Sequence, residues 1–227
     1  AIFLLKKATS SFIMYLGDDD FLPKGYLSRV LECISSDTVG AIVPGISSLD
    51  RNGVIQPARY EKYDEKLYAP GFFSVISVSS FGHQLSGIVV KRKKILDKYT
   101  YNSSLRNIYP FIFFLSYSNF KYSTYYLPSY KILVSISNNK DWSYDDSGLL
   151  LEIFKNYRIL YPKSALRRSI CCISVMLLQG WRLRPGSKPK VVYGAYKQIV
   201  SSAEVDLFVK FCLIPIYCYL YARLFTG

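Results

Sequence analysis

Residues 12–34 read FIMYLGDDDFLPKGYLSRVLECI, and this stretch decides how the whole sequence is interpreted. The apolar run over residues 10–17 is typical of a short strand, and Gly17 ends it. Pro23 occupies a favourable first-turn position for a following helix. Apolar side chains then recur at helical spacing, at Leu22, Tyr26, Leu27, Val30, Leu31 and Ile34. A strand, an acidic turn and a helix in this order predict an α/β sheet domain.

Three consecutive carboxylates, Asp18, Asp19 and Asp20, lie between the predicted strand and helix. Ligands of open α/β sheets bind beyond the carboxyl ends of strands, which is where these side chains fall. Hard oxygen ligands suit Mg²⁺ or Mn²⁺, ions that take one or two protein carboxylates and fill their shell with water and substrate phosphates. The alternative is a helix N-cap by Asp20, favoured by the helix dipole. One Asp satisfies a cap, so three favour the metal.

The first 140 residues are expected to form a mixed α/β sheet domain with flanking helices. The chain opens on an apolar strand-like run, and residues 60–70 are polar and tyrosine-rich, which is typical of a loop. The other predicted elements are strands over 39–50, 54–60 and 84–92, one or two strands over 121–137, and helices over 70–80, 92–99 and 109–118.

Residues 141–227 differ in composition and predict a helical region that associates with a membrane. The periodicity favours helices over 145–160, 164–181, 189–204 and 205–224. The last of these is almost entirely apolar, with Lys210 and Arg223 as its cations and Pro215 in its middle. An interfacial helix on a membrane surface is expected. Packing on the core and a true membrane span are the alternatives.

The chain carries 29 Lys and Arg against 16 Asp and Glu, a formal charge of +13 that favours polyanionic partners. Nucleic acid is disfavoured as that partner, because no RNA-binding, zinc-finger or helix-turn-helix signature is present. None of the five Cys forms a CxxC pair, so we expect reduced thiols without a disulfide framework or zinc site. A single His, His83, argues against a histidine-based metal centre.

Three segments resemble family 2, GT-A-type nucleotide-sugar glycosyltransferases of the O-antigen and capsule polysaccharide kind. FIMYLGDDDFLPKGYLSRVLECI resembles the family's Asp-rich DxD-type element between an apolar strand and a helix. FGHQLSGIVVKRKKI (81–95) resembles its acceptor-side strand, and SISNNKDW (135–142) matches more weakly an Asn-Trp element. The resemblance covers roughly residues 8–145 and implies a GT-A-like mixed sheet.

This resemblance implies a divalent-metal-dependent glycosyltransferase, using Mg²⁺ or Mn²⁺. The enzyme would move a sugar from a nucleoside-diphosphate donor to a lipid-linked or polysaccharide acceptor. It would be cytoplasmic and peripheral to the inner face of the cell membrane. Asp18, Asp19 and Asp20 would include the metal and diphosphate ligands; one register of the motif selects Asp19 and Asp20, and the other selects Asp18 and Asp20. The residues implied for donor and acceptor binding are His83, Ser86, Gly87 and Arg92.

The sequence departs from this family at two places. The nucleotide-binding half that precedes the DxD element in the family is mostly absent, so we expect an N-terminally truncated chain or an inactive membrane-associated fragment. No Asp or Glu occurs from residue 100 to 140, where a general base is expected. The candidates from elsewhere are Asp97 and Asp141 first, then Asp145, Glu61 and Asp64.

Overall fold

The computed structural model describes residues 2–57, 64–100, 107, 109–135, 149–178, 183 and 189–226. The chain divides into two compact units. The first comprises Ala1–Leu105 and Phe111–Asn139, and the second comprises Arg106–Pro110 and Lys140–Gly227. Each unit is described by itself.

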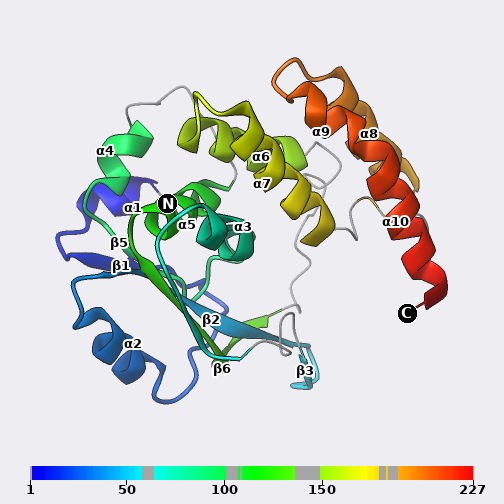
Figure 1. Cartoon of the computed structure of the whole chain (residues 1–227). Coiled ribbons are helices and arrows are strands. Elements are labelled where there is room, and N and C mark those ends of the chain that lie inside the picture. The colour runs from blue at the N-terminus through cyan, green and yellow to red at the C-terminus, as the bar shows by residue number, and fades with distance from the viewer. Residues whose placement is uncertain are drawn as a thin grey trace. The chain divides into compact units, whose positions relative to one another are not determined.

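The first unit is built on a six-stranded mixed sheet (Figure 1). Its strands lie in the order β1-β5-β2-β6-β4, and β3 pairs with β2. The strands are β1 (Phe12–Met14), β2 (Val39–Leu49), β3 (Ile55–Pro57), β4 (Lys66–Tyr68), β5 (Val89–Lys91) and β6 (Ser123–Ser135). The helices are α1 (Ile2–Lys7), α2 (Tyr26–Ile34), α3 (Phe72–Val78), α4 (Ile95–Thr100), α5 (Pro110–Lys121) and the 3₁₀ helix η1 (Ser79–His83).

The strand directions bring three carboxyl ends to one edge of the sheet. β2 and β6 pair in parallel, whereas β5 is antiparallel to both β1 and β2. It follows that β1, β2 and β6 run in the same direction. The segment after β1, which carries the three carboxylates, therefore lies at the same edge as the end of β6.

Helices cover both faces of this sheet (Figure 1). On one face, α2 packs Tyr26, Val30 and Cys33 against strand residues such as Ile42 and Val89. On the other face lie α3, η1 and α5, where the Phe81 ring of η1 contacts the Tyr126 ring of β6, with centroids 5.4 Å apart. Because α5 is apolar on all sides, its residues from 112 to 119 are all buried.

The sequence-based predictions of strands and helices were wrong at two places in this unit. The apolar start of the chain forms the helix α1, and the segment expected to be a loop contains β4, which pairs with β6. The region over 121–137, predicted to form one or two strands, forms one long strand, β6, whose pairing with β2 jumps from Pro44–Leu127 to Gly45–Lys131. The irregularity begins at Pro128, whose missing N–H cannot join a sheet ladder.

The second unit is helical in the part that the structure describes. Its helices are α6 (Leu149–Leu160), α7 (Ala165–Leu178), α8 (Pro189–Ser201), α9 (Leu207–Phe211) and α10 (Leu213–Thr226). An ion pair ties α7 to the start of α9: the Arg168 guanidinium donates to both carboxylate oxygens of Asp206, at 3.1 and 2.7 Å. Among the described residues, no helix is both long enough and apolar enough to cross a membrane.

Candidate active site

Backbone hydrogen bonds bring the segment after β1 against the segment before β5. The Tyr15 N–H donates to the Ile88 carbonyl (3.3 Å), and the Gly87 N–H donates to the Tyr15 carbonyl (2.8 Å). These bonds continue the antiparallel pairing of β1 and β5 beyond its last ladder pair, Met14 with Val89. As a result, Gly17 lies beside Ser86, although 69 residues separate them in the sequence.

Ser86 connects Gly17 to the carboxylate of Asp20. Its hydroxyl is almost completely buried, accepts a hydrogen bond from the Gly17 N–H (2.9 Å) and donates to Asp20 Oδ2. The other carboxylate oxygen, Asp20 Oδ1, accepts from the Ser135 N–H at the end of β6 (3.2 Å). Both oxygens of Asp20 therefore have a fixed donor, and each keeps a lone pair for a further partner.

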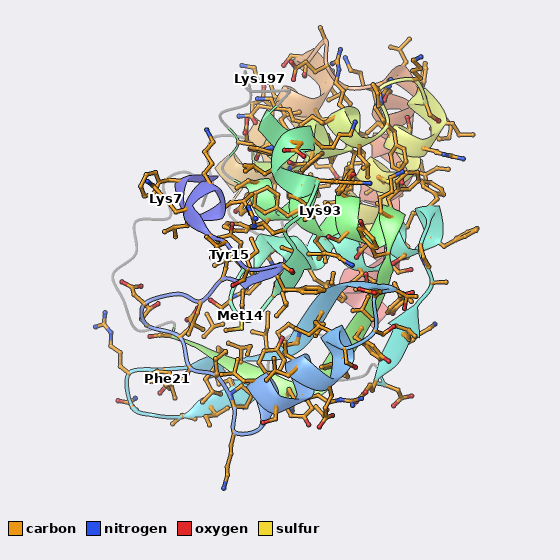
Figure 2. All side chains as sticks on the ribbon, turned by 90° about the vertical axis from the view of Figure 1, so that its left-hand side faces the viewer. Lys7, Met14, Tyr15, Phe21, Lys93 and Lys197 are labelled. Atoms are coloured by element: carbon orange, nitrogen blue, oxygen red, sulfur yellow. The ribbon has the colours of Figure 1, made fainter. Side chains whose placement is uncertain are left out.

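The segment after the carboxylates is anchored to β6. Phe21 and Leu133 exchange two backbone hydrogen bonds, of 2.9 and 3.0 Å. The carboxylate loop therefore runs between two fixed points, the end of β1 at Met14 and Tyr15 and the bridge at Phe21, all three labelled in Figure 2. Within it, Asp18 is exposed and Asp19 and Asp20 are half-buried.

Two glycines allow this close approach. A Cβ on Gly17 would lie 2.5 Å from Asp20 Oδ2, so a side chain there would displace the carboxylate. Gly87 has φ +78°, and a Cβ there would lie 2.6 Å from Ile132 Cγ1 and 2.9 Å from Pro44 Cγ. The side chains that would meet a Cβ on Gly87 therefore come from β2 and β6. The role of Gly87 in binding a donor or acceptor stays a prediction.

Two buried tyrosines contact the segments on either side of the site. The Tyr26 hydroxyl donates to the Gly87 carbonyl at 2.6 Å, and burial raises the pKa of this hydroxyl. Burial also raises the pKa of Tyr15 to about 12, and its ring contacts the rings of Phe111 and Phe114. Both hydroxyls therefore stay protonated at neutral pH and serve as structural groups. Neither tyrosine stands out in the sequence as a site residue.

His83 lies with Ser86 beside a small pocket, lined mostly by apolar side chains of β2, η1 and the segment leading into β5. Its Nδ1 is 2.6 Å from the Ser80 carbonyl oxygen, which can only accept, so Nδ1 carries the proton. In the neutral imidazole, Nε2 is then an acceptor. The structure thus brings His83, Ser86, Gly87 and Asp20 into one region.

Arg92 does not lie with this group. Its Nε donates to the Ser10 carbonyl (3.0 Å) and its N–H donates to the Ser11 carbonyl (2.8 Å). Ser10 and Ser11 precede β1, whereas Gly17 follows it. Arg92 is therefore at the opposite end of the β1–β5 ladder from Ser86, and its role in binding a donor or acceptor stays a prediction.

Only two of the five candidate general bases lie among the described residues. Asp97 is exposed on α4, beyond the Arg92 end of β5, and contributes to the raised pKa of Tyr117 on α5, which burial causes chiefly. Asp64 is exposed just before β4. Asp141, Asp145 and Glu61 lie outside the described residues.

The carboxylate loop suits a divalent ion whose coordination shell is completed by phosphates of the substrate. Among the described residues, no group of three or more His, Cys, Asp or Glu side chains could hold a metal by itself. Mg²⁺ and Mn²⁺ commonly take one or two carboxylates together with substrate phosphates. The fixed Asp20, with the exposed Asp18 and the half-buried Asp19 beside it, fits that kind of donor set.

Replacing Ser86 by Ala is expected to lower the free energy of unfolding by about 1–3 kcal/mol. The change removes the donor to Asp20 Oδ2 and the acceptor of the Gly17 N–H in a buried place. Urea denaturation would measure the loss. The matched control is Ser36→Ala, which removes an exposed hydroxyl bonded to Thr38 Oγ1 and should change stability by less than about 0.5 kcal/mol. Equal stabilities of the two variants would contradict the bonding assigned to Ser86.

Comparison with solved structures gives a match that bears on the fold. No protein-family model matches the sequence, and no curated protein does. Among solved structures, the chain resembles the crystal structure of S. aureus TarS 1-349 in complex with UDP-GlcNAc, with a TM-score of 0.54 at 12% identity. The match covers 96% of this chain and 67% of that chain. At this identity the likeness shows the fold alone, a glycosyltransferase fold. It confirms the predicted α/β class: a mixed sheet flanked by helices, followed by a helical C-terminal region.

Proposed function

We propose that this chain is a divalent-metal-dependent glycosyltransferase that transfers a sugar from a nucleoside-diphosphate donor. The observation that carries the proposal is a carboxylate, Asp20, fixed by Ser86 and Ser135 at the edge where β1, β2 and β6 end. Such an edge is where open α/β sheets bind their ligands. The likeness to a fold crystallised with UDP-GlcNAc supports a nucleotide sugar as that ligand.

Asp18, Asp19 and Asp20 would hold the ion, Mg²⁺ or Mn²⁺. When bound, such an ion neutralises phosphate charge and stabilises a departing diphosphate. In the transfer, the bond from the anomeric carbon to the diphosphate oxygen breaks and the nucleoside diphosphate leaves. A bond forms from that carbon to the oxygen of an acceptor hydroxyl, whose proton passes to a general base. Ser86 orients Asp20 for this task, and His83 lies beside the same region, where Nε2 of the neutral imidazole would accept a hydrogen bond from a sugar hydroxyl.

The acceptor we propose is lipid-linked or a growing polysaccharide, reached from the cytoplasmic side of the membrane surface. The excess positive charge of the chain supports this location, because cytoplasmic leaflets are anionic. A polyprenyl-diphosphate type of acceptor would place its phosphates at that surface.

Calorimetric titration with a panel of nucleoside-diphosphate sugars tests this function. We expect at least one donor to bind in the presence of Mn²⁺ and its affinity to fall by at least about tenfold in EDTA, because an ion held by the carboxylates would neutralise charge on the donor's diphosphate. UDP-GlcNAc belongs in the panel because the similar structure contains it.

Two results would contradict the proposal. The first is that no donor in the panel binds with or without Mn²⁺. The second is that an oligonucleotide binds instead, with an affinity that falls steeply as salt increases, since counterion release governs nucleic-acid binding.

A further inference from the structure

The two last helices form one hydrogen-bonded rod with a single interruption. The Cys212 N–H donates to the Phe208 carbonyl (3.1 Å), and the Ile216 N–H donates to the Cys212 carbonyl (3.0 Å). Pro215 has no N–H to donate to Phe211, which accounts for the break between α9 and α10. Its place in the first turn of α10 is one that tolerates proline. The segment can therefore be read as one helix with two sides.

One side of this rod is buried and the other is exposed, yet both are apolar. The buried side consists of Val209, Leu213, Ile216 and Leu220. The exposed side, which we call the exposed stripe, consists of Leu207, Phe211, Ile214, Cys218 and Tyr221. The stripes are offset by two residues, or about 200° around a helix, so they lie on nearly opposite sides.

The exposed stripe is unusual for a helix that faces water. Phe211 is 76% exposed and Ile214 is 75% exposed. No Asp, Glu, Lys or Arg occurs from Phe211 to Ala222. A helix on a water-exposed surface normally carries charged and polar residues on its outer side. A continuous apolar surface of this kind marks a binding face.

The neighbouring helix α8 adds to the apolar surface of this unit. It lies beside α10 (Figure 1), and the Tyr196 and Tyr217 rings make an edge-to-face contact with centroids 5.8 Å apart. On α8, Tyr193, Lys197 and Val200 are exposed at helical spacing. Tyrosine rings with one apolar and one polar end suit the boundary between lipid and water.

The positive charge of residues 149–227 favours an anionic partner. Residues 149–227 contain twelve Lys and Arg but only three acidic residues, Glu152, Glu204 and Asp206. Two of these acids are paired within the unit, Glu152 with Lys155 and Asp206 with Arg168. Two copies of so basic a region would repel each other, which disfavours self-association. An anionic surface is attracted instead.

We propose that the exposed stripe docks on the surface of an anionic lipid bilayer, with α9 and α10 lying in the interface. α10 has 14 residues, so it extends about 21 Å, less than the roughly 30 Å of a bilayer core. Interfacial helices bind by apolar burial together with attraction between cations and anionic lipid, and both are present here. This docking face would be the one by which the proposed enzyme contacts the membrane, and in that respect it rests on the proposed function.

Vesicle co-sedimentation of the whole chain tests this docking face. We expect binding to vesicles of phosphatidylcholine with about 30% phosphatidylglycerol, and much weaker binding to pure phosphatidylcholine, because anionic lipid attracts the cations of this region. The double variant Phe211→Ser/Ile214→Ser should bind the anionic vesicles at least about tenfold more weakly, because two anchoring side chains are lost. Both side chains are exposed, so the fold should be unaffected.

The matched control is Leu31→Ser/Phe73→Ser, which removes two equally exposed apolar side chains from α2 and α3 of the sheet unit. It should bind vesicles like the unchanged chain. Three results would overturn the inference: absence of vesicle binding, equal losses in the two double variants, or a concentration-dependent dimer that only the stripe variant loses.

A second measurement reports directly on the stripe. Cys218 is an exposed thiol within it, whereas Cys171 and Cys172 are buried. Alkylation of Cys218 by a water-soluble maleimide should slow by at least about fivefold when anionic vesicles are added, since the interface excludes the reagent. An unchanged rate on bound protein would show that another face docks.

Failure of this inference can be told apart from failure of the proposed function. Donor binding is measured without vesicles, so the stripe variant should retain it. If vesicles bind and no donor does, only the proposed function fails. If a donor binds and vesicles do not, only the docking face fails.

Discussion

Gly87→Ala is expected to lower the free energy of unfolding by about 2–5 kcal/mol. The φ of +78° alone costs a residue with a Cβ roughly 1–2 kcal/mol. The new methyl group would also meet Ile132 and Pro44 at distances from 2.6 to 2.9 Å, and overpacking of a core typically costs about 1–3 kcal/mol. Chemical denaturation with a two-state fit would measure the sum.

Gly53 provides a control that separates strain from crowding. It has φ +77° in the turn between β2 and β3, and no atom lies within 4 Å of a Cβ placed there. Gly53→Ala should therefore cost only the backbone strain, about 1–2 kcal/mol. If Gly87→Ala were no more destabilising than Gly53→Ala, the close packing of Ile132 and Pro44 against Gly87 would be contradicted.

Much of the fold could be predicted because periodicity in this sequence is strong. The buried strand β2, its hairpin with β3 and the amphipathic helix α2 all follow from local patterns. The helix α1 did not, because six residues are too few to separate an apolar helix from an apolar strand. β4 is three residues long and takes its structure from pairing with β6, which local sequence does not report.

The motifs of the candidate site could be predicted from the sequence, but the residues that hold them in place could not. The acidic triplet and the Ser-Gly pair stand out as motifs, and the structure joins them through the hydrogen bond between Ser86 and Asp20. Ser135, in contrast, contributes a backbone N–H, which has no signature in the sequence. Tyr26 looked like one more apolar position of a helix, and only tertiary contact shows that its hydroxyl holds Gly87.

The double variant Asp18→Asn/Asp19→Asn is expected to reduce metal-dependent turnover of the donor at least about 100-fold. These carboxylates are the two neighbours of the fixed Asp20 in the chain, and Asp18 is exposed while Asp19 is half-buried. Asn keeps the shape but removes the negative charge that a divalent ion requires. Asp20 is left in place because its carboxylate also holds Gly17, Ser86 and Ser135 together, and its loss would disturb the loop itself.

The most direct test of the central claim is the rate at which the nucleoside diphosphate is released from its sugar donor, with Mn²⁺ and with EDTA. The unchanged chain and the control Asp37→Asn, an exposed acid between α2 and β2, should release it only with Mn²⁺. Asp18→Asn/Asp19→Asn should release it at least about 100-fold more slowly. Release that is equal in EDTA, or equal in the double variant, would contradict a metal-dependent glycosyltransferase site at this loop.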